Sequence, residues 1–138
     1  MRRTISFALL SVLAIAAYAS SDSIFERAPD SDRKKVNPYA NQSDAVAAGS
    51  KLFSDHCAKC HGSDAMGRGR KPGLRTKEVQ QAADGEIFWL LRNGSTRHGM
   101  PSWSSLPEPS RWQIITYIKS LGDSSTGSST SSPRGNGQ

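Results

Sequence analysis

The segment Cys57-Ala58-Lys59-Cys60-His61 is the most informative part of the sequence, and it contains both cysteines of the chain. It has the form C-x-x-C-H, which is typical of covalent attachment of a c-type haem. On a helical turn, residues i, i+3 and i+4 share a face, so both thiols can reach the vinyl groups of one porphyrin while the imidazole lies under the iron. We therefore predict one haem c, bound through two thioether bonds from Cys57 and Cys60, with His61 as an iron ligand.

Two other kinds of site share part of this pattern. A redox disulfide of the C-x-x-C type expects a surrounding βαβ pattern, whereas the flanks here read as helical and rich in glycine. A zinc site needs four ligands, usually in two pairs. Only one cysteine pair exists, so His56 and His98 would have to supply the other two ligands. His56 adjoins Cys57, and its side chain would have to turn back to reach a metal held by Cys57. Haem is the favoured interpretation.

The first residues have the features of a secretory signal. Met1-Arg2-Arg3 is a short basic segment, residues 5–17 are almost entirely apolar, and Ala17-Tyr18-Ala19 offers a cleavage site. The apolar stretch is shorter than the ~20 residues that a membrane-spanning helix needs. We expect residues 1–19 to be cleaved and the protein to be exported, soluble, to the periplasm, where haem c is attached; an uncleaved signal anchor is the alternative and the only membrane contact expected.

Composition divides the rest of the chain into three parts. Residues 20–42 are polar and broken by prolines, which predicts an N-terminal arm or linker. Residues 122–138 are rich in serine and glycine, which predicts a disordered tail. The folded domain is then expected at residues 43–121, a length that suits one small domain. The formal charge of +6 is modest, and the basic residues are not interleaved with aromatic ones. A nucleic-acid partner is therefore not expected.

Three helical patterns and no strand pattern occur in residues 43–121, so the fold is predicted to be all-α. The first helix begins near residue 43 and places Gly49 and Phe53 on the face that leads to Cys57. The second covers about residues 84–92 and ends at an Asn-Gly pair. The third begins within residues 107–109 and is predicted to stop at Gly122. Loops rich in glycine and basic residues join these helices.

The second axial ligand of the iron has three candidates: Met66, His98 and Met100. Met66 follows His61 too closely for the chain to circle a porphyrin. Met100 lies much later, between a glycine that lets the backbone come close and a proline that stiffens it. We favour Met100, with His98 as the competitor. A thioether ligand raises the haem potential relative to a second histidine and closes the iron to small ligands.

Together these motifs resemble the class I cytochromes c, single-haem electron carriers of the periplasm. The resemblance covers residues 43–121 in the family's order, through Ala48-Gly49-x-x-Leu52-Phe53-x-x-x-Cys57-x-x-Cys60-His61-Gly62, Asp84-Gly85-Glu86-Ile87-Phe88 with Asn93-Gly94, Gly99-Met100-Pro101, and Trp112 with Tyr117-Ile118-x-x-Leu121.

The resemblance implies an all-α cytochrome c fold, with three main helices and loops wrapped around one haem. It implies that the first and last helices cross closely, with Gly49 and Phe53 meeting Tyr117. It also implies that Pro72 and Leu74 pack on the proximal side of the haem, and that His61 and Met100 are the axial pair.

A basic loop departs from the family pattern. Positions 68–77 carry no acid and five cations: Arg68, Arg70, Lys71, Arg75 and Lys77. One interpretation is an ordinary solvated loop. The other is a docking patch, Arg68–Lys77, that steers an acidic redox partner protein. Arg75 could instead pair with a haem propionate.

From the motif and the resemblance we predict a periplasmic electron carrier that is not an enzyme and has no catalytic residues. Such a carrier needs an iron whose six ligands do not change with oxidation state. The alternatives are a gas-binding or sensor protein, which needs an open distal site, and a carrier subunit of a periplasmic dehydrogenase or terminal oxidase. Cytochrome peroxidases resemble this family but use two haems, and the chain has one C-x-x-C-H motif.

Overall fold

The computed structural model describes residues 23–123, and this part of the chain is built from helices and loops. The predicted signal segment (1–19) and most of the predicted tail (122–138) lie outside the described residues. Within 23–123 the only ladder pairings are two isolated bridges, Arg68 with Lys71 and Ser95 with Met100. The prediction of an all-α fold is confirmed. No helix in the described range is both long and apolar enough to cross a bilayer.

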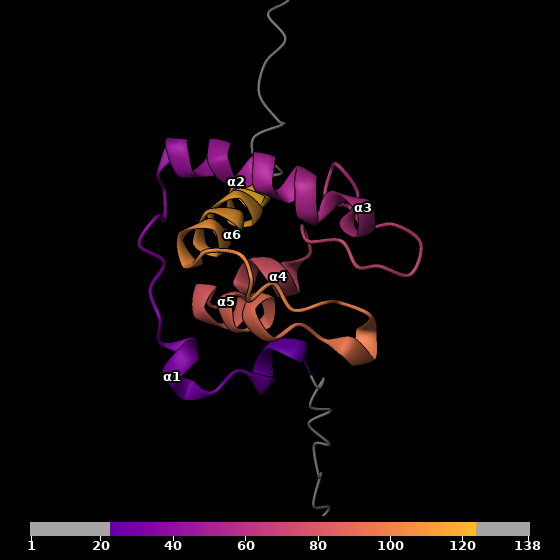
Figure 1. The fold of residues 1–138 in the computed structure, drawn as a ribbon, viewed down its shortest axis with the longest axis horizontal. Helices are drawn as coiled ribbons and strands as arrows, with labels where there is room; N and C mark the ends of the chain where they lie inside the picture. Colours follow the sequence, from indigo (N-terminus) through magenta and orange to yellow (C-terminus); the bar gives the residue numbers. More distant parts are fainter. Residues whose placement is uncertain (1–22, 124–138) are drawn as a thin grey trace, which may run out of the picture.

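Three of the helices are long, as predicted: α2 (Ser43–His56), α5 (Asp84–Asn93) and α6 (Glu108–Asp123). Figure 1 shows α2 crossing α6 at one end of the molecule, with α5 below them. The shorter elements are η1 (Ile24–Arg27), α1 (Asp30–Arg33), α3 (Ala58–His61), α4 (Lys77–Gln81) and η2 (Thr96–His98). Helix α6 continues to Asp123, past the predicted stop at Gly122, and Gly122 lies within the helix against the side chain of Gln80.

The crossing of α2 and α6 is the centre of the fold. Gly49 lies where the two helices meet, and a Cβ at this position would overlap the backbone carbonyl of Gln113. The rings of Phe53 and Tyr117 lie next to it, with centroids 5.3 Å apart. This is the contact that the family resemblance implied. A mid-helix glycine costs about 1 kcal/mol relative to alanine, and the close approach of the helices explains why it is there.

Helix α5 supplies the second half of the core. Its Phe88 is 1% exposed and stacks on Trp112 of α6, with ring centroids 4.0 Å apart. Ile87, Leu90 and Leu91 on the same helix are also buried. At the start of α5, the Glu86 carboxylate accepts a hydrogen bond from the Ala83 backbone N–H at 2.8 Å, which satisfies one of the donors left free at a helix N-terminus.

The described part of the predicted arm or linker, residues 23–42, packs on α5. Phe25 and Ala28 are buried, and Gly85 of α5 lets the backbone at Asp32 come close. The Asp32 carboxylate forms ion pairs with Lys35 at 2.6 Å and with Arg92 of α5 at 3.0 Å. These contacts attach residues 23–42 to the helix that leads toward Met100. The domain bounds of 43–121 stay a prediction.

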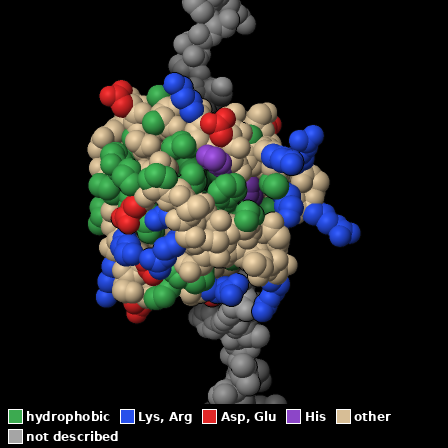
Figure 2. Space-filling model, viewed as in Figure 1, with side chains coloured by type: hydrophobic (Ala, Val, Ile, Leu, Met, Phe, Trp, Pro, Cys, Tyr) green, Lys and Arg blue, Asp and Glu red, His purple; other side chains and the backbone are tan. Residues whose placement is uncertain are grey.

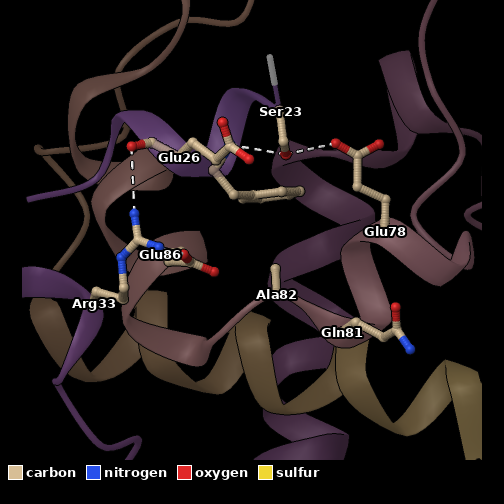
Figure 3. Close-up of a pocket in the computed structure, with 8 residues that line it drawn as sticks. Ser23, Glu26, Arg33, Glu78, Gln81, Ala82 and Glu86 are labelled. Carbon is tan, nitrogen blue, oxygen red and sulfur yellow. Dashed lines mark hydrogen bonds and ion pairs between the residues drawn. The ribbon is translucent and has the colours of Figure 1, made fainter. Parts of the chain in front are cut away.

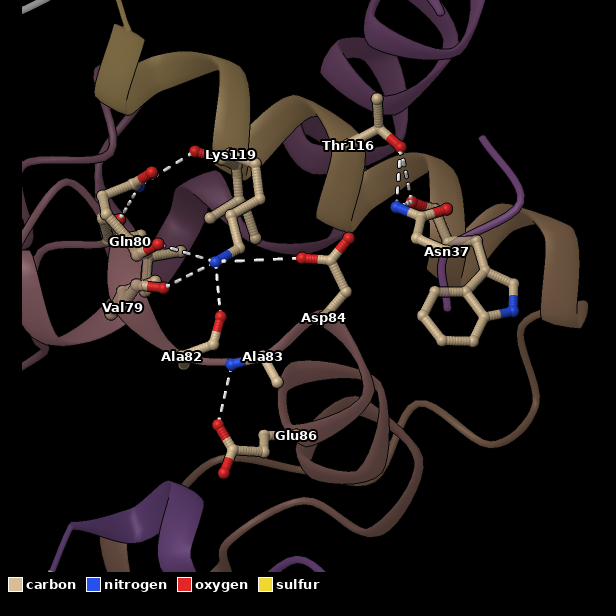
Figure 4. Close-up of polar contacts among 12 residues, drawn as sticks. Asn37, Val79, Gln80, Ala82, Ala83, Asp84, Glu86, Thr116 and Lys119 are labelled. Carbon is tan, nitrogen blue, oxygen red and sulfur yellow. Dashed lines mark hydrogen bonds and ion pairs between the residues drawn. The ribbon is translucent and has the colours of Figure 1, made fainter. Parts of the chain in front are cut away.

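Two polar contacts hold the surrounding segments to α6 (Figure 4). The Lys119 ammonium donates to the carbonyls of Val79, Gln80 and Ala82 at the end of α4. This is the position where a cation meets the free carbonyls of a helix C-terminus. Burial lowers the pKa of Lys119 from its ordinary value, and Asp84, 3.8 Å away, opposes that shift. About one turn earlier on α6, the Asn37 amide donates to the Thr116 hydroxyl at 3.0 Å.

Candidate haem site

The C-x-x-C-H motif lies on the turn that joins α2 to α3. Cys57 is the C-cap of α2 and the N-cap of α3. Its carbonyl accepts hydrogen bonds from the backbone N–H groups of Cys60 and His61, at 3.0 and 2.9 Å. The three residues therefore share one helical turn, as the spacing indicated. Cys57 is buried, Cys60 is exposed, and both are free thiols.

The Cys57 thiol does not have the electrostatics of a redox-active cysteine. Burial, and to a lesser extent the neighbouring Cys60, raises the pKa of the Cys57 thiol to about 11. Thiols that exchange disulfides need a lowered pKa, because the thiolate is the nucleophile. The zinc alternative lacks a donor set, since among residues 23–123 no three His, Cys, Asp or Glu side chains come together in a metal-binding group. The arrangement suits two permanent covalent bonds to a porphyrin.

The His61 ring is oriented by the backbone of a later residue. Its Nδ1 lies 2.8 Å from the carbonyl oxygen of Pro72. A carbonyl can only accept, so Nδ1 carries the proton and Nε2 keeps its lone pair. Ligating histidines almost always donate their other ring N–H in this way, which fixes the tautomer and raises the basicity of the ligand. No residue type marks a carbonyl acceptor, so the sequence could not predict this contact.

Residues 62–74, the proximal loop, bring Pro72 to His61 by folding back on themselves. At the tip, Arg68 and Lys71 exchange backbone hydrogen bonds of 3.1 and 2.9 Å. Nearer the helix, the N–H of Gly67 donates to the His61 carbonyl at 2.8 Å, and that of Leu74 donates to Ala65 at 2.7 Å. The return of the chain is therefore set mainly by the loop's own backbone.

Residues 94–106, the distal loop, carry Met100 and lie on the same side of the molecule as α3 (Figure 1). Met100 and Ser95 exchange backbone hydrogen bonds of 3.0 and 2.8 Å. Gly94, with φ +70°, lies against this turn, and a Cβ there would come within 2.6 Å of the carbonyl carbon of Pro101. The backbone of Met100 is therefore closely confined.

The distal loop is anchored to two helices. Two carbonyls near the end of α5 accept hydrogen bonds from the loop. The Leu91 carbonyl accepts from the Trp103 N–H at 2.8 Å, and the Arg92 carbonyl accepts from the Ser102 hydroxyl at 2.6 Å. From α6, the Arg111 guanidinium donates to three loop carbonyls, those of Trp103, Ser104 and Leu106 at 3.3, 3.1 and 2.7 Å. The position of Met100 thus depends on the packing of α5 and α6, the two helices that flank the loop.

The three candidates for the second axial ligand differ in their surroundings. Met66 is 64% exposed. His98 is exposed, and its Nδ1 lies 2.8 Å from the Ser95 hydroxyl. Met100 is half-buried and packs against the core. These surroundings favour Met100, and its role as ligand stays a prediction.

The apolar side chains around the two loops fit a porphyrin. Several are only half-buried although they pack on the core: Leu52, Ala58, Leu74, Trp89, Met100, Trp103 and Leu106. They come from α2, α3, α5 and both loops, and they surround the elements that carry the two cysteines and the candidate ligands. Thiols for attachment, an oriented imidazole, a thioether and this apolar surface together form a donor set and an environment that suit a covalent haem.

The basic loop projects from the same side. In Figure 2, Lys and Arg side chains stand out at the edge of the molecule where the proximal loop lies. Arg68 and Arg70 are exposed, whereas Lys71 is half-buried. Arg75 donates from Nε to the Asp64 carbonyl at 2.9 Å, so it contributes to the loop itself.

A shallow pocket of about 300 Å³ lies elsewhere, between η1, α1 and α4 (Figure 3). Four of its polar side chains are paired with each other. The Ser23 hydroxyl donates to the Glu78 carboxylate at 2.7 Å, and Arg33 forms an ion pair with Glu86 at 3.1 Å. None of the lining residues belongs to the C-x-x-C-H motif or to the distal loop, so we assign this pocket no role in the site.

Comparison with known proteins points to the same cofactor, a covalently bound haem c. Residues 44–118, more than half of the chain, match the family described as cytochrome C oxidase, cbb3-type, subunit III. Cytochrome c550 of Pseudomonas aeruginosa is 33% identical over 90 residues, which is 61% of each chain. Quinohemoprotein alcohol dehydrogenase ADH-IIG of Pseudomonas putida is 34% identical over 96 residues, 67% of this chain and 13% of that protein.

A third relative is the Cbb3-type cytochrome c oxidase subunit FixP of Rhizobium meliloti, 31% identical over 86 residues, 59% of this chain and 29% of the relative. The chain thus spans less than two thirds of each of these relatives. The chain belongs to the cytochrome C oxidase, cbb3-type, subunit III family, as a single-haem class I c-type cytochrome with covalently bound haem c.

Proposed function

We propose that the protein is a periplasmic electron carrier whose iron is held by His61 and Met100. The observation that carries this proposal is that both candidate ligands are held by hydrogen bonds of the fold. The His61 ring is fixed by the Pro72 carbonyl, and the Met100 backbone by Ser95. Ligands held in this way keep their positions when the charge of the iron changes, and a small rearrangement favours fast electron transfer.

The bound haem supplies a one-electron Fe(II)/Fe(III) couple, and its potential follows from the axial ligands and their hydrogen bonds. Within the chain, His61 offers Nε2 because Nδ1 is used by Pro72. Met100 offers a thioether, which favours a higher potential than a second histidine would. No further group in this arrangement is needed for electron transfer, so we propose a carrier without catalytic residues.

The carrier is expected to act with redox partner proteins, in one of two settings. The name of cytochrome c550 describes a cytochrome alone, whereas the other two relatives are named as an oxidase subunit and a dehydrogenase. The protein could thus act as a free carrier, as the first name suggests, or as a carrier subunit of an oxidase or dehydrogenase, as the other two suggest. Co-purification of the protein from its native membranes distinguishes the two.

We further propose that partners dock on the basic loop. Arg68 and Arg70 are exposed on it, and Cys60, one predicted attachment point of the haem, is exposed as well. Positive charge there would steer an acidic partner and raise the association rate. Replacing both arginines by glutamine should slow reduction by such a partner at low salt and have little effect at high salt. An unchanged rate at low salt would show that the loop is only solvated.

The assignment of the iron ligands is tested with Met100→Ala and His98→Ala in the haem-loaded protein. Met100→Ala should lower the reduction potential in a voltammetric titration and open the reduced iron to carbon monoxide. His98→Ala should leave both properties unchanged and serves as the matched control two positions away. If the effects fall on His98→Ala instead, histidine is the ligand. If the unmodified protein binds carbon monoxide freely, the gas-binding alternative replaces the carrier.

A further inference from the structure

Lys71 connects the proximal loop to the distal loop. Its ammonium Nζ donates to the His98 carbonyl at 3.2 Å and to the Gly99 carbonyl at 3.5 Å. A Cβ at Gly99 would lie 2.8 Å from Nζ, so a side chain there would push the ammonium away from its present position. Lys71 is half-buried, unlike the exposed Arg68 and Arg70 on the same loop. A cation that reaches across to backbone carbonyls is therefore more than a solvated charge.

The dipeptide Lys71-Pro72 contacts both candidate ligand segments. The Pro72 carbonyl holds the His61 ring, and the next side chain toward the N-terminus, that of Lys71, holds the turn before Met100. The backbone of Lys71 is itself fixed by its paired hydrogen bonds with Arg68. The ammonium is thus presented from a short, braced segment rather than from a free chain.

The carbonyls that Lys71 holds are well placed to affect Met100. The Gly99 carbonyl belongs to the peptide group whose N–H is that of Met100. That N–H donates to the Ser95 carbonyl at 3.0 Å. Holding one side of this peptide group therefore limits rotation of the other. The anchors to the helices, at Ser102 and Trp103, hold the chain after Met100. Lys71 holds the chain before it.

We propose that Lys71 is a positioning residue that keeps Met100 on the iron by bridging the two loops. The inference rests on the proposed role of Met100 as axial ligand. Loss of the bridge would loosen the turn at residues 98–100, so Met100 would leave the haem iron more often and small ligands would bind faster. The bridge also makes the two axial ligands depend on each other, since both are held from one dipeptide.

The test compares Lys71→Met with Arg70→Met in the haem-loaded protein. Both changes remove one positive charge from the same loop, but only Lys71 holds the distal loop. Lys71→Met should raise the rate of carbon monoxide binding to the reduced protein about tenfold, the factor expected for losing a hydrogen bond to a charged group. It should also weaken the methionine–iron absorption band of the oxidised protein. Arg70→Met should change neither, and Lys71→Arg should restore most of both.

A second variant disturbs the same bridge by a change in the distal loop. Gly99→Ala would displace the ammonium, and Gly69→Ala is its matched control. Both glycines have positive φ, +70° and +59°, but a Cβ at Gly69 meets nothing within 4 Å. Gly99→Ala should reproduce the effect of Lys71→Met, and Gly69→Ala should not. This pair decides the question if Lys71→Met does not take up haem.

Equal carbon monoxide rates in Lys71→Met, Arg70→Met and the unmodified protein would overturn the proposal. So would equal effects of the two charge removals, which would point to the charge of the loop rather than to the bridge. Met100→Ala separates this failure from failure of the proposed function. If Met100→Ala opens the iron and Lys71→Met does not, only the bridge is wrong. If Met100→Ala has no effect either, the axial assignment and the bridge fall together.

Discussion

The proximal and distal loops carry the two candidate iron ligands, and they are held in place differently. The proximal loop is shaped largely by its own backbone hydrogen bonds, and its Pro72 carbonyl holds the His61 ring. The distal loop is anchored by the carbonyls of α5 and by Arg111 of α6. The position of His61 is thus a local property, and that of Met100 is a property of the packed fold. Disturbing the packing should therefore affect Met100 first.

The largest effect is expected from Arg111→Met. The arginine is 7% exposed and donates to three distal-loop carbonyls. Hydrogen bonds to charged groups contribute about 1.5–3 kcal/mol each, without simple additivity. We expect the free energy of unfolding to fall by about 3 kcal/mol in denaturant titration, with faster carbon monoxide binding.

Arg75→Met is the matched control on the proximal side. Arg75 donates to one carbonyl, that of Asp64, and is more exposed than Arg111. Its loss should cost about 1 kcal/mol and leave carbon monoxide binding unchanged. If the two variants behave alike, the distal loop does not depend on its anchors as we describe.

An effect of comparable size is expected from Gly94→Ala. An L-residue at positive φ costs about 1–2 kcal/mol, and here the Cβ would also meet the backbone of Pro101 and Ser102 at 2.6 Å. Overpacking of this kind costs a further 1–3 kcal/mol, roughly. Thermal unfolding and the methionine–iron absorption band should both change.

Gly69→Ala isolates the conformational part of that cost. It lies at positive φ in the proximal loop, with open space around the Cβ position. It should lower the unfolding temperature slightly and leave the absorption band as it is. A weakened band in Gly69→Ala would mean that the proximal loop also controls Met100 through its shape.

The smallest effect concerns acid. The hydrogen bond from Lys35, helped by the charge of Arg92, outweighs burial and holds the pKa of Asp32 below its ordinary value of 3.8. A carboxyl with a lowered pKa in the folded state adds stability above its unfolded pKa, and this is lost as pH falls through the folded pKa. Unfolding monitored from pH 5 downward should show this loss below about pH 4, and Asp32→Asn should flatten it.

The same acid titration bears on the comparison of the loops. Arg92 forms an ion pair with Asp32, and its backbone carbonyl holds Ser102 of the distal loop. Protonation of Asp32 should therefore loosen the distal loop before the proximal one. Hydrogen exchange at low pH would show this as earlier exchange of the Trp103 amide than of the Leu74 amide. The opposite order would contradict it.

Much of the fold was predictable because its signals are local. Helical spacing predicted the three long helices, and Gly49 indicated a close crossing that the structure places at Gln113. The C-x-x-C-H motif predicted the turn on which Cys57, Cys60 and His61 lie. The short elements were not predicted, since the four or five residues of α1 or α4 are too few to show a period.

The supports of the site could not be predicted in the same way. Pro72, Arg111 and Lys71 all act through backbone carbonyls as acceptors or partners. Every residue has a carbonyl, so no residue type marks the ones that are used. The packing of residues 23–42 on α5 was also hidden, because Phe25 is a single buried aromatic in a polar stretch. Only the folded chain brings these groups together.

The central claim is that His61 and Met100 close the iron on both sides. It is tested most directly by the absorption spectrum of the reduced, haem-loaded protein before and after adding carbon monoxide. We predict an unchanged spectrum, because the anchored distal loop keeps Met100 in place. Rapid appearance of a full carbonyl spectrum would contradict the account and favour a gas-binding protein.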